Sequence, residues 1–114
     1  MRKIAWMRGA TKAFTRLPAG VREQMLEALA VAQRGGLSDT ARPMKGDLRD
    51  IVEIRIGTAG GSYRTMYTTQ FGAFLYVVHV FQKKSTHGSE TPKREIDVIR
   101  RRLKAIRAVG AQRN

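Results

Sequence analysis

The chain has 114 residues, the size of one small domain, and its hydrophobic fraction of 42% can build a modest core, which excludes global disorder. It has no cysteine, which excludes disulfide frameworks, thiol chemistry and cysteine-ligated zinc. The longest mainly apolar run, 71–81, is too short to cross a bilayer as a helix. The first residues lack the apolar stretch of a signal peptide, so we expect a cytoplasmic protein without membrane contacts.

The net charge of +13 is concentrated at the two ends of the chain. Residues 1–16 carry five bases and no acids, and residues 83–114 carry ten bases and three acids. Such an asymmetry indicates a polyanionic partner, of which nucleic acid is the commonest in the cytoplasm. The alternative on charge alone is an acidic protein partner.

In chain order, the first predicted elements are one strand and two helices. Residues 3–7 are short and apolar, as a strand would be, and 9–16 predict a short helix that ends before Pro18. From Pro18 to Arg34 the apolar residues recur at helical spacing, and the glycines at 35 and 36 end the pattern. The two helices therefore form a hairpin.

A loop is predicted over 37–50, followed by a three-stranded meander. Val52, Ile54 and Ile56 alternate with polar residues, which is the pattern of a half-buried strand. The segments 63–69 and 74–81 are rich in β-branched and aromatic residues, and the second is apolar on both faces, as a central strand should be.

The last predicted element is a helix that begins at Pro92 and ends at Arg107. Its apolar stripe comprises Ile96, Ile99, Leu103 and Ile106, and we expect 108–114 to fray. The order is β-α-α-β-β-β-α, and the fold class is α/β (α+β). The helical hairpin packs on one face of a small, mostly antiparallel sheet, and the other face is open or covered by the last helix.

Several motifs in this order resemble those of the RelE/ParE superfamily of bacterial toxins, in its phage-derived, HigB-like branch. The resemblance extends from Trp6 to about Leu103. It depends on Trp6, LPAGVR at 17–22, AQRG at 32–35, RPMK at 42–45, VEIR at 52–55, Tyr63-Arg64 with Tyr67, and HVFQKK at 79–84 with Thr91-Pro92. Each motif is weak alone, but their order and spacing are specific.

This resemblance implies a single RelE-like domain over 1–107 and an endoribonuclease that cleaves translated messenger RNA on the ribosome. It implies no metal or organic cofactor, and a cognate antitoxin, a HigA-like helix-turn-helix protein, as partner. ParE-type relatives share the fold but inhibit DNA gyrase, so a gyrase inhibitor is the leading alternative. A non-catalytic RNA-binding module is the third hypothesis.

Metal-free RNA cleavage needs a base for the 2′-hydroxyl, cations for the phosphorane and a proton for the leaving oxygen. Arg64 matches the family's phosphate-stabilising arginine, and an arginine fork suits that role. Lys84 takes the family position for phosphate binding or proton transfer, with Lys83 close behind. Adjacent strand residues point to opposite faces, so only one of these lysines is expected in the site.

Other polar residues have less specific roles. Arg55 is a candidate RNA contact on the same strand face as Glu53, and Glu53 is expected to pair with Arg55 rather than act as a base. We expect this face, and the face from which Arg64 projects, to be open. His79 lies among apolar residues and is expected to be buried and hydrogen-bonded. His87 could donate a proton to the leaving group.

The last helix and two aromatic residues complete the candidates. Crowded bases on the helix suit contact with ribosomal RNA or an acidic antitoxin segment; they are Arg100, Arg101, Arg102, Lys104 and Arg107. Trp6 is expected in the core, whereas Tyr67 could pack there or stack on a base.

Overall fold

The computed structural model describes residues 1–84 and 90–112. Its strands are β1 (Lys3–Trp6), β2 (Ala41–Pro43), β3 (Val52–Thr58), β4 (Gly61–Thr68) and β5 (Phe74–Lys84). Its helices are α1 (Ala10–Thr15), α2 (Ala19–Gln33), the short 3₁₀ helix η1 (Gly46–Leu48) and α3 (Lys93–Gln112). The predicted α+β class and element order are confirmed, with β2 and η1 added inside the segment predicted as a loop.

The five strands form one sheet in the order β1-β5-β4-β3-β2, in which β1 runs parallel to β5 and all other pairs are antiparallel. β2 was missed because it has three residues, ends in Pro43 and pairs at the edge, where a proline is tolerated. β4 and β5 are flanked by strands on both sides, which agrees with their β-branched and aromatic composition.

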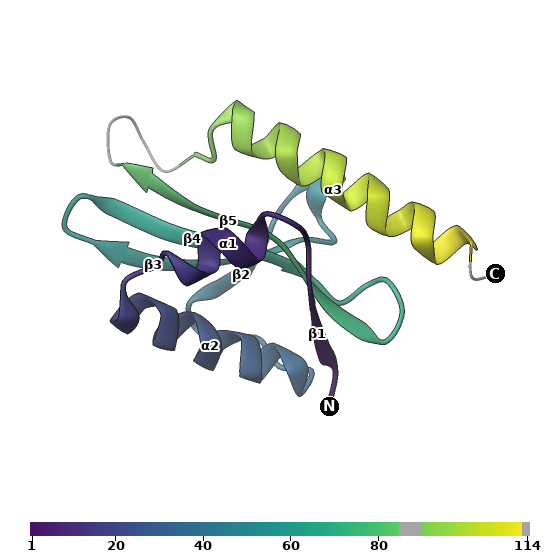
Figure 1. Cartoon of the computed structure of the whole chain (residues 1–114), viewed down its shortest axis with the longest axis horizontal. Coiled ribbons are helices and arrows are strands. Elements are labelled where there is room, and N and C mark those ends of the chain that lie inside the picture. Colours follow the sequence, from purple (N-terminus) through teal and green to yellow (C-terminus); the bar gives the residue numbers. More distant parts are fainter. Residues whose placement is uncertain (85–89, 113–114) are drawn as a thin grey trace.

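The helical hairpin of α1 and α2 covers one face of the sheet (Figure 1). Met25 and Leu29 of α2 are fully buried there against strand residues that include Ile54. Trp6 packs on this core with its ring centroid 4.8 Å from that of Phe14, as predicted. Tyr67 lies in the same core and is 2% exposed, so it packs rather than stacks on a base.

α3 covers the opposite face (Figure 1), so the second of the two predicted arrangements is the observed one. Its stripe of Ile99, Leu103 and Ile106 is buried against the sheet and η1. The helix extends to Gln112, beyond the end predicted at Arg107, because a helix can continue without an apolar stripe to mark it in the sequence. No helix in the described ranges is long and apolar enough to cross a membrane.

One irregularity in the sheet determines what lies beneath α3. Met66 pairs with His79, but the next residue, Tyr67, pairs with Val77, so Val78 is an extra residue in β5. At this bulge the strand alternation is interrupted. Val78 and His79 therefore both contact the α3 side: Val78 joins its apolar core, and His79 contacts Glu95 of the helix.

Candidate active site beneath the start of α3

The register of β3 and β4 places four polar side chains on the α3 side of the sheet. Ile54 is buried under α2, so its neighbours Glu53 and Arg55 point to the opposite face. Arg55 pairs with Arg64 across the two strands, and Ser62 precedes Arg64 by two residues on the same face.

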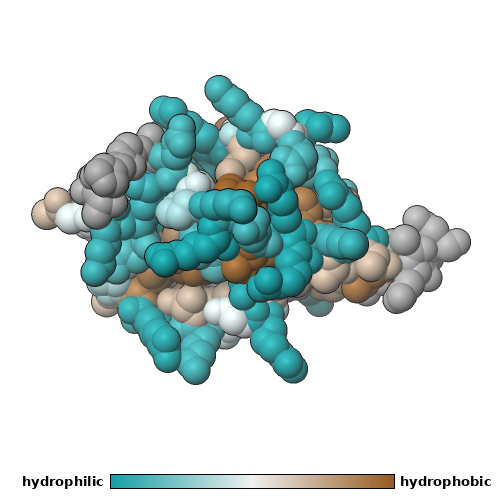
Figure 2. All heavy atoms as spheres, turned by 90° about the horizontal axis from the view of Figure 1, so that it is seen from above, coloured by the Kyte–Doolittle hydropathy of each residue, from teal (hydrophilic) through white to brown (hydrophobic). Residues whose placement is uncertain are grey.

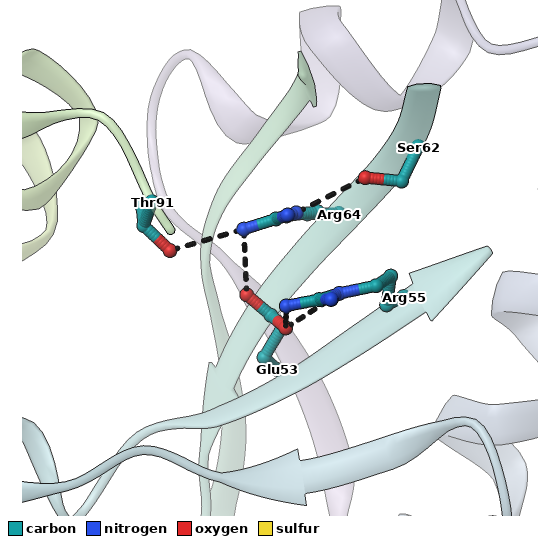
Figure 3. Close-up of polar contacts among 5 residues, drawn as sticks. All are labelled: Glu53, Arg55, Ser62, Arg64 and Thr91. Carbon is teal, nitrogen blue, oxygen red and sulfur yellow. Dashed lines mark hydrogen bonds and ion pairs between the residues drawn. The ribbon is translucent and has the colours of Figure 1, made fainter. Parts of the chain in front are cut away.

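Arg64 is the centre of this group (Figure 3). Its Nε donates to the Ser62 hydroxyl at 3.1 Å, and its Nη1 donates to the Thr91 hydroxyl at 3.2 Å. The same Nη1 lies 3.4 Å from Oε2 of Glu53. Three segments of the chain, β3, β4 and the residues just before α3, thus hold one guanidinium in a defined orientation.

Glu53 links the two arginines. Its Oε1 accepts hydrogen bonds from Nε and Nη2 of Arg55 at 3.1 and 2.8 Å, while its Oε2 faces Arg64 (Figure 3). The predicted ion pair between Glu53 and Arg55 is confirmed. Because both carboxylate oxygens accept from guanidinium groups, Glu53 orients the arginines.

The expectation of an open face is wrong for Arg64 and holds in part for Arg55. Arg64 is only 2% exposed, and Thr91, just before α3, lies against its Nη1, whereas the Arg55 side chain is 42% exposed. Burial lowers the pKa of Arg64, Glu53 opposes this by raising it, and Arg55 lowers it further. An arginine remains protonated under such a shift, so the site keeps a buried positive charge at neutral pH.

The two lysines at the end of β5 point in different directions. Lys83 pairs with Ser62, lies on the Arg64 side of the sheet and is 8% exposed, whereas Lys84 pairs with Gly61 and is exposed. Strand alternation therefore brings Lys83, rather than Lys84, to the face of Arg64. Both lysines line a hollow at the end of β5, together with the segment 90–95.

His79 is hydrogen-bonded beneath α3, as predicted, but it is partly buried rather than fully buried. Nη1 of Arg102 lies 3.1 Å from its Nδ1, and Oε1 of Glu95 lies 3.2 Å from its Nε2. An arginine can only donate, so Nδ1 accepts and the proton of the neutral ring is on Nε2, which donates to Glu95. Burial lowers the pKa of His79, more than the hydrogen bond to Glu95 raises it. His87 lies outside the described residues.

The bases predicted on the last helix separate into two groups. Arg100 binds Asp47 at 2.8 Å, and Arg107 lies 3.4 Å from Asp50. Arg102 is partly buried and donates to the carbonyl oxygen of Val78 at 2.8 Å. These three arginines connect α3 to the body of the protein, whereas Arg101 and Lys104 form no hydrogen bond or ion pair within residues 1–84 and 90–112.

Sequence reasoning missed Ser62 and Thr91 as partners of Arg64. Ser62 could have been found from its i−2 position on the same strand face. Thr91 could not, because its contact bridges 27 residues and depends on where α3 lies. Within the ranges 1–84 and 90–112, no three histidine or carboxylate side chains are placed to hold a metal ion.

Comparison with known proteins identifies the family. The model of the phage-derived protein Gp49-like family matches residues 12–104. The isolated Escherichia coli RelE toxin has a similar structure, with a TM-score of 0.59 and 19% identity over 89% of this chain and 98% of that chain. A chain of the toxin–antitoxin complex RelBE2 from Mycobacterium tuberculosis has a TM-score of 0.50 and 15% identity over 72% of this chain and 98% of that one.

At these identities the two structures demonstrate a shared fold and nothing finer. A search of curated proteins finds no match. The family model, however, covers most of the chain, from α1 to the middle of α3. The chain therefore belongs to the phage-derived Gp49-like family.

Proposed function

We propose that this protein is the toxin of a type II toxin–antitoxin pair and a metal-independent endoribonuclease that cleaves messenger RNA on the ribosome. The observation that carries the proposal is the cluster of Glu53, Arg55 and Arg64, with Lys83 on the same face. A preorganised set of cations is what stabilisation of a phosphorane requires. The fold, similar to that of the RelE toxin, is consistent with this activity.

The proposed reaction begins when a ribose 2′-hydroxyl gives its proton to solvent water and its oxygen attacks the adjacent phosphorus. The new P–O bond gives a 2′,3′-cyclic phosphate, and the bond to the 5′-oxygen breaks once that oxygen receives a proton. Arg64 stabilises the charge that accumulates on the phosphorane oxygens between these events. Arg55, the exposed member of the pair, contacts the incoming phosphate first.

The burial of Arg64 places a condition on this mechanism. The Thr91 hydroxyl accepts a hydrogen bond from Nη1 of Arg64 at 3.2 Å, which is the kind of contact that a phosphate oxygen makes with a guanidinium. In our proposal the scissile phosphate replaces Thr91 at this nitrogen. The contacts to Ser62 and Glu53 stay in place and keep the guanidinium aimed.

Proton transfer is assigned to the lysine pair at the end of β5. Lys83 is on the face of Arg64, and Lys84 lines the same hollow from the end of the strand. An ammonium group there can donate a proton to the leaving 5′-oxygen. Glu53 and His87 are the secondary candidates, and Glu53 ranks lower because its oxygens accept from arginines.

We also propose a cognate antitoxin as partner, of the HigA-like helix-turn-helix type that accompanies the HigB-like branch. The M. tuberculosis structure with a similar fold is a toxin–antitoxin complex, which supports a partner of this general kind.

The test is primer extension on a message incubated with purified ribosomes and the purified protein. We expect cleavage only when the message is being translated, and a larger loss from Lys83→Ala than from Lys84→Ala. Arg34→Ala is the matched control, because Arg34 is exposed at the end of α2 on the other side of the sheet. An intact message, with DNA supercoiling altered by the expressed protein, would establish the gyrase alternative instead.

A further inference from the structure

The seven bases of α3 are of two kinds, which the structure separates by their contacts. Arg100, Arg102 and Arg107 bind Asp47, the β5 backbone and Asp50, respectively, although the side chains of Arg100 and Arg107 are 51% and 49% exposed. The other four are exposed, and none of them forms a hydrogen bond or ion pair within the described ranges; they are Lys93, Arg94, Arg101 and Lys104. We call these four residues the outer stripe.

The outer stripe lies on one side of α3 as two pairs of bases, Lys93 with Arg94 and Arg101 with Lys104, and Asp97 lies between the pairs. At 100° per residue its four positions fall within an arc of about 100°, on the side of α3 opposite the buried Ile99 and Leu103. From Lys93 to Lys104 the stripe is about 16 Å long. Figure 2, which looks onto the side of the molecule that α3 covers, shows hydrophilic side chains crowding this surface.

The stripe is unfavourable for the isolated helix. Lys93 and Arg94 lie in the first turn, where the helix dipole disfavours positive charge. Arg101 and Lys104 are three residues apart on the helix surface, and like charges at that spacing repel each other. Asp97 is the single acid on this side of the helix and forms no ion pair with the stripe in the described structure. A polyanion bound along the stripe would relieve this repulsion.

The stripe also adjoins the candidate active site. Lys93 and Arg94 line the same hollow as Lys83 and Lys84 at the end of β5. Basic side chains therefore extend from the end of the strand that carries Lys83 along α3 as far as Lys104, although Glu90 and Glu95 also line the hollow. A chain of phosphates has the extended, repeating charge that fits such a surface, whereas a single small anion does not.

We propose that the outer stripe binds the sugar–phosphate backbone of ribosomal RNA and holds the protein on the ribosome, apart from the phosphate that is cleaved. This inference extends the proposed function, which places the protein on the ribosome. An acidic protein is the less suitable partner. Protein interfaces centre on apolar or aromatic anchors, and the nearest exposed large apolar residue on α3, Val109, lies beyond the stripe.

The experiment measures binding of the full-length protein to purified ribosomes over a range of KCl concentrations. One variant carries Lys93→Gln, Arg94→Gln, Arg101→Gln and Lys104→Gln. The matched control loses the same charge from exposed bases of the other half of the chain, by Arg8→Gln, Lys12→Gln, Arg16→Gln and Arg34→Gln. Circular dichroism confirms that both variants are folded.

Each phosphate contact contributes about 0.7 to 0.9 to the slope of log affinity against log salt, so the stripe variant should lose roughly 3 from the wild-type slope. The control should keep nearly all of it. Equal losses in both variants would mean that net charge alone drives binding, and an unchanged slope in the stripe variant would overturn the proposal. A stripe variant that binds ribosomes normally but escapes neutralisation by its antitoxin would assign the surface to a protein.

This measurement does not depend on cleavage. A wild-type protein that binds ribosomes with the steep salt slope but leaves the message intact would refute the proposed nuclease activity. The proposed role of the outer stripe in ribosome binding would stand. If the wild-type protein cleaves the message but the stripe variant binds ribosomes with an unchanged slope, the proposed role of the outer stripe is refuted and the proposed nuclease activity stands.

Discussion

Arg64 illustrates how much of a functional residue is visible in a sequence. Strand alternation places it on the face of Glu53 and Arg55, and the register confirms that placement. Its burial could not be predicted, because charged residues are almost never fully buried without partners, and its partner Thr91 is distant in the sequence. The Arg64 guanidinium contacts three residues and is therefore held in one orientation, as a binding site for phosphate requires and as a flexible surface arginine is not.

Replacing Arg64 with alanine should therefore affect both activity and stability. We expect cleavage to fall by ~100- to 1000-fold, the usual effect of losing one transition-state donor. The free energy of unfolding should fall by about 1–3 kcal/mol, because the Ser62 and Thr91 hydroxyls lose a buried partner. Primer extension and thermal denaturation measure the two effects.

Arg55→Ala is the comparison for that variant. It removes an ion pair in which the arginine side chain is 42% exposed, so the free energy of unfolding should fall by less than about 1 kcal/mol. If Arg64→Ala unfolds no more easily than Arg55→Ala, the buried network is weaker than its geometry indicates. If Arg64→Ala cleaves at the wild-type rate, Arg64 is not in the active site.

At the scale of the elements, the periodicity of apolar residues predicted the main helices and strands. It did not predict the features that depend on how strands pair and on which face of the sheet a helix covers. The stripe from Ile96 to Ile106 identified the buried face of α3, but periodicity cannot say which sheet face that stripe covers. β2 is too short to show alternation. The extra residue Val78 was invisible, because a bulge is defined by the partner strand and leaves the apolar run of β5 unbroken.

The bulge makes the docking of α3 dependent on pH through His79. The unfolded chain protonates this residue at the ordinary histidine pKa of about 6.5, whereas burial lowers its pKa in the folded protein. Below about pH 6.5 the unfolded chain therefore binds more protons, and stability decreases as the pH falls through this value. Protonation also removes the acceptor for Arg102 and places two cations together.

We expect the midpoint of thermal unfolding to fall between pH 7 and pH 5, and to fall less in His79→Gln. The glutamine amide can still accept from Arg102 and donate to Glu95, but it does not titrate. The same measurement on His87→Gln reports the contribution of the other histidine. An identical pH dependence in His79→Gln and the wild type would show that His79 is not coupled to folding.

At the scale of the whole molecule, a small sheet is covered on both faces, so its polar site must lie at an edge of one of these cores. Among the described residues, the α1/α2 face is mainly apolar and carries no charged side chain at its centre, although Thr65 is buried there, whereas the α3 face changes from the apolar Met66 and Val78 to the polar Arg64 and Ser62. α3 covers both parts. The helix thus contributes to the core and, through its outer stripe, to the positively charged surface, while Thr91 just before it contacts Arg64.

The charge of +13 gives salt two opposite effects on this molecule. A large net charge destabilises the compact state by self-repulsion, and salt screens that repulsion over a Debye length of about 10 Å at 0.1 M. The midpoint of thermal unfolding should therefore rise between 0.05 and 0.5 M KCl, by roughly 4 °C for each kcal/mol relieved. Over the same range, ribosome affinity should fall, because counterion release weakens every phosphate contact.

The variant that lacks the outer stripe separates these effects, because its formal charge is lower by four. Its unfolding midpoint should start higher at low salt and rise less with KCl than that of the wild type, as its helix carries fewer mutually repelling bases. A wild-type midpoint that falls with KCl would mean that the surface ion pairs of Asp47 and Asp50 outweigh the repulsion. In that case the bases of α3 would be balanced within the folded protein, and repulsion among them would not favour the binding of a polyanion.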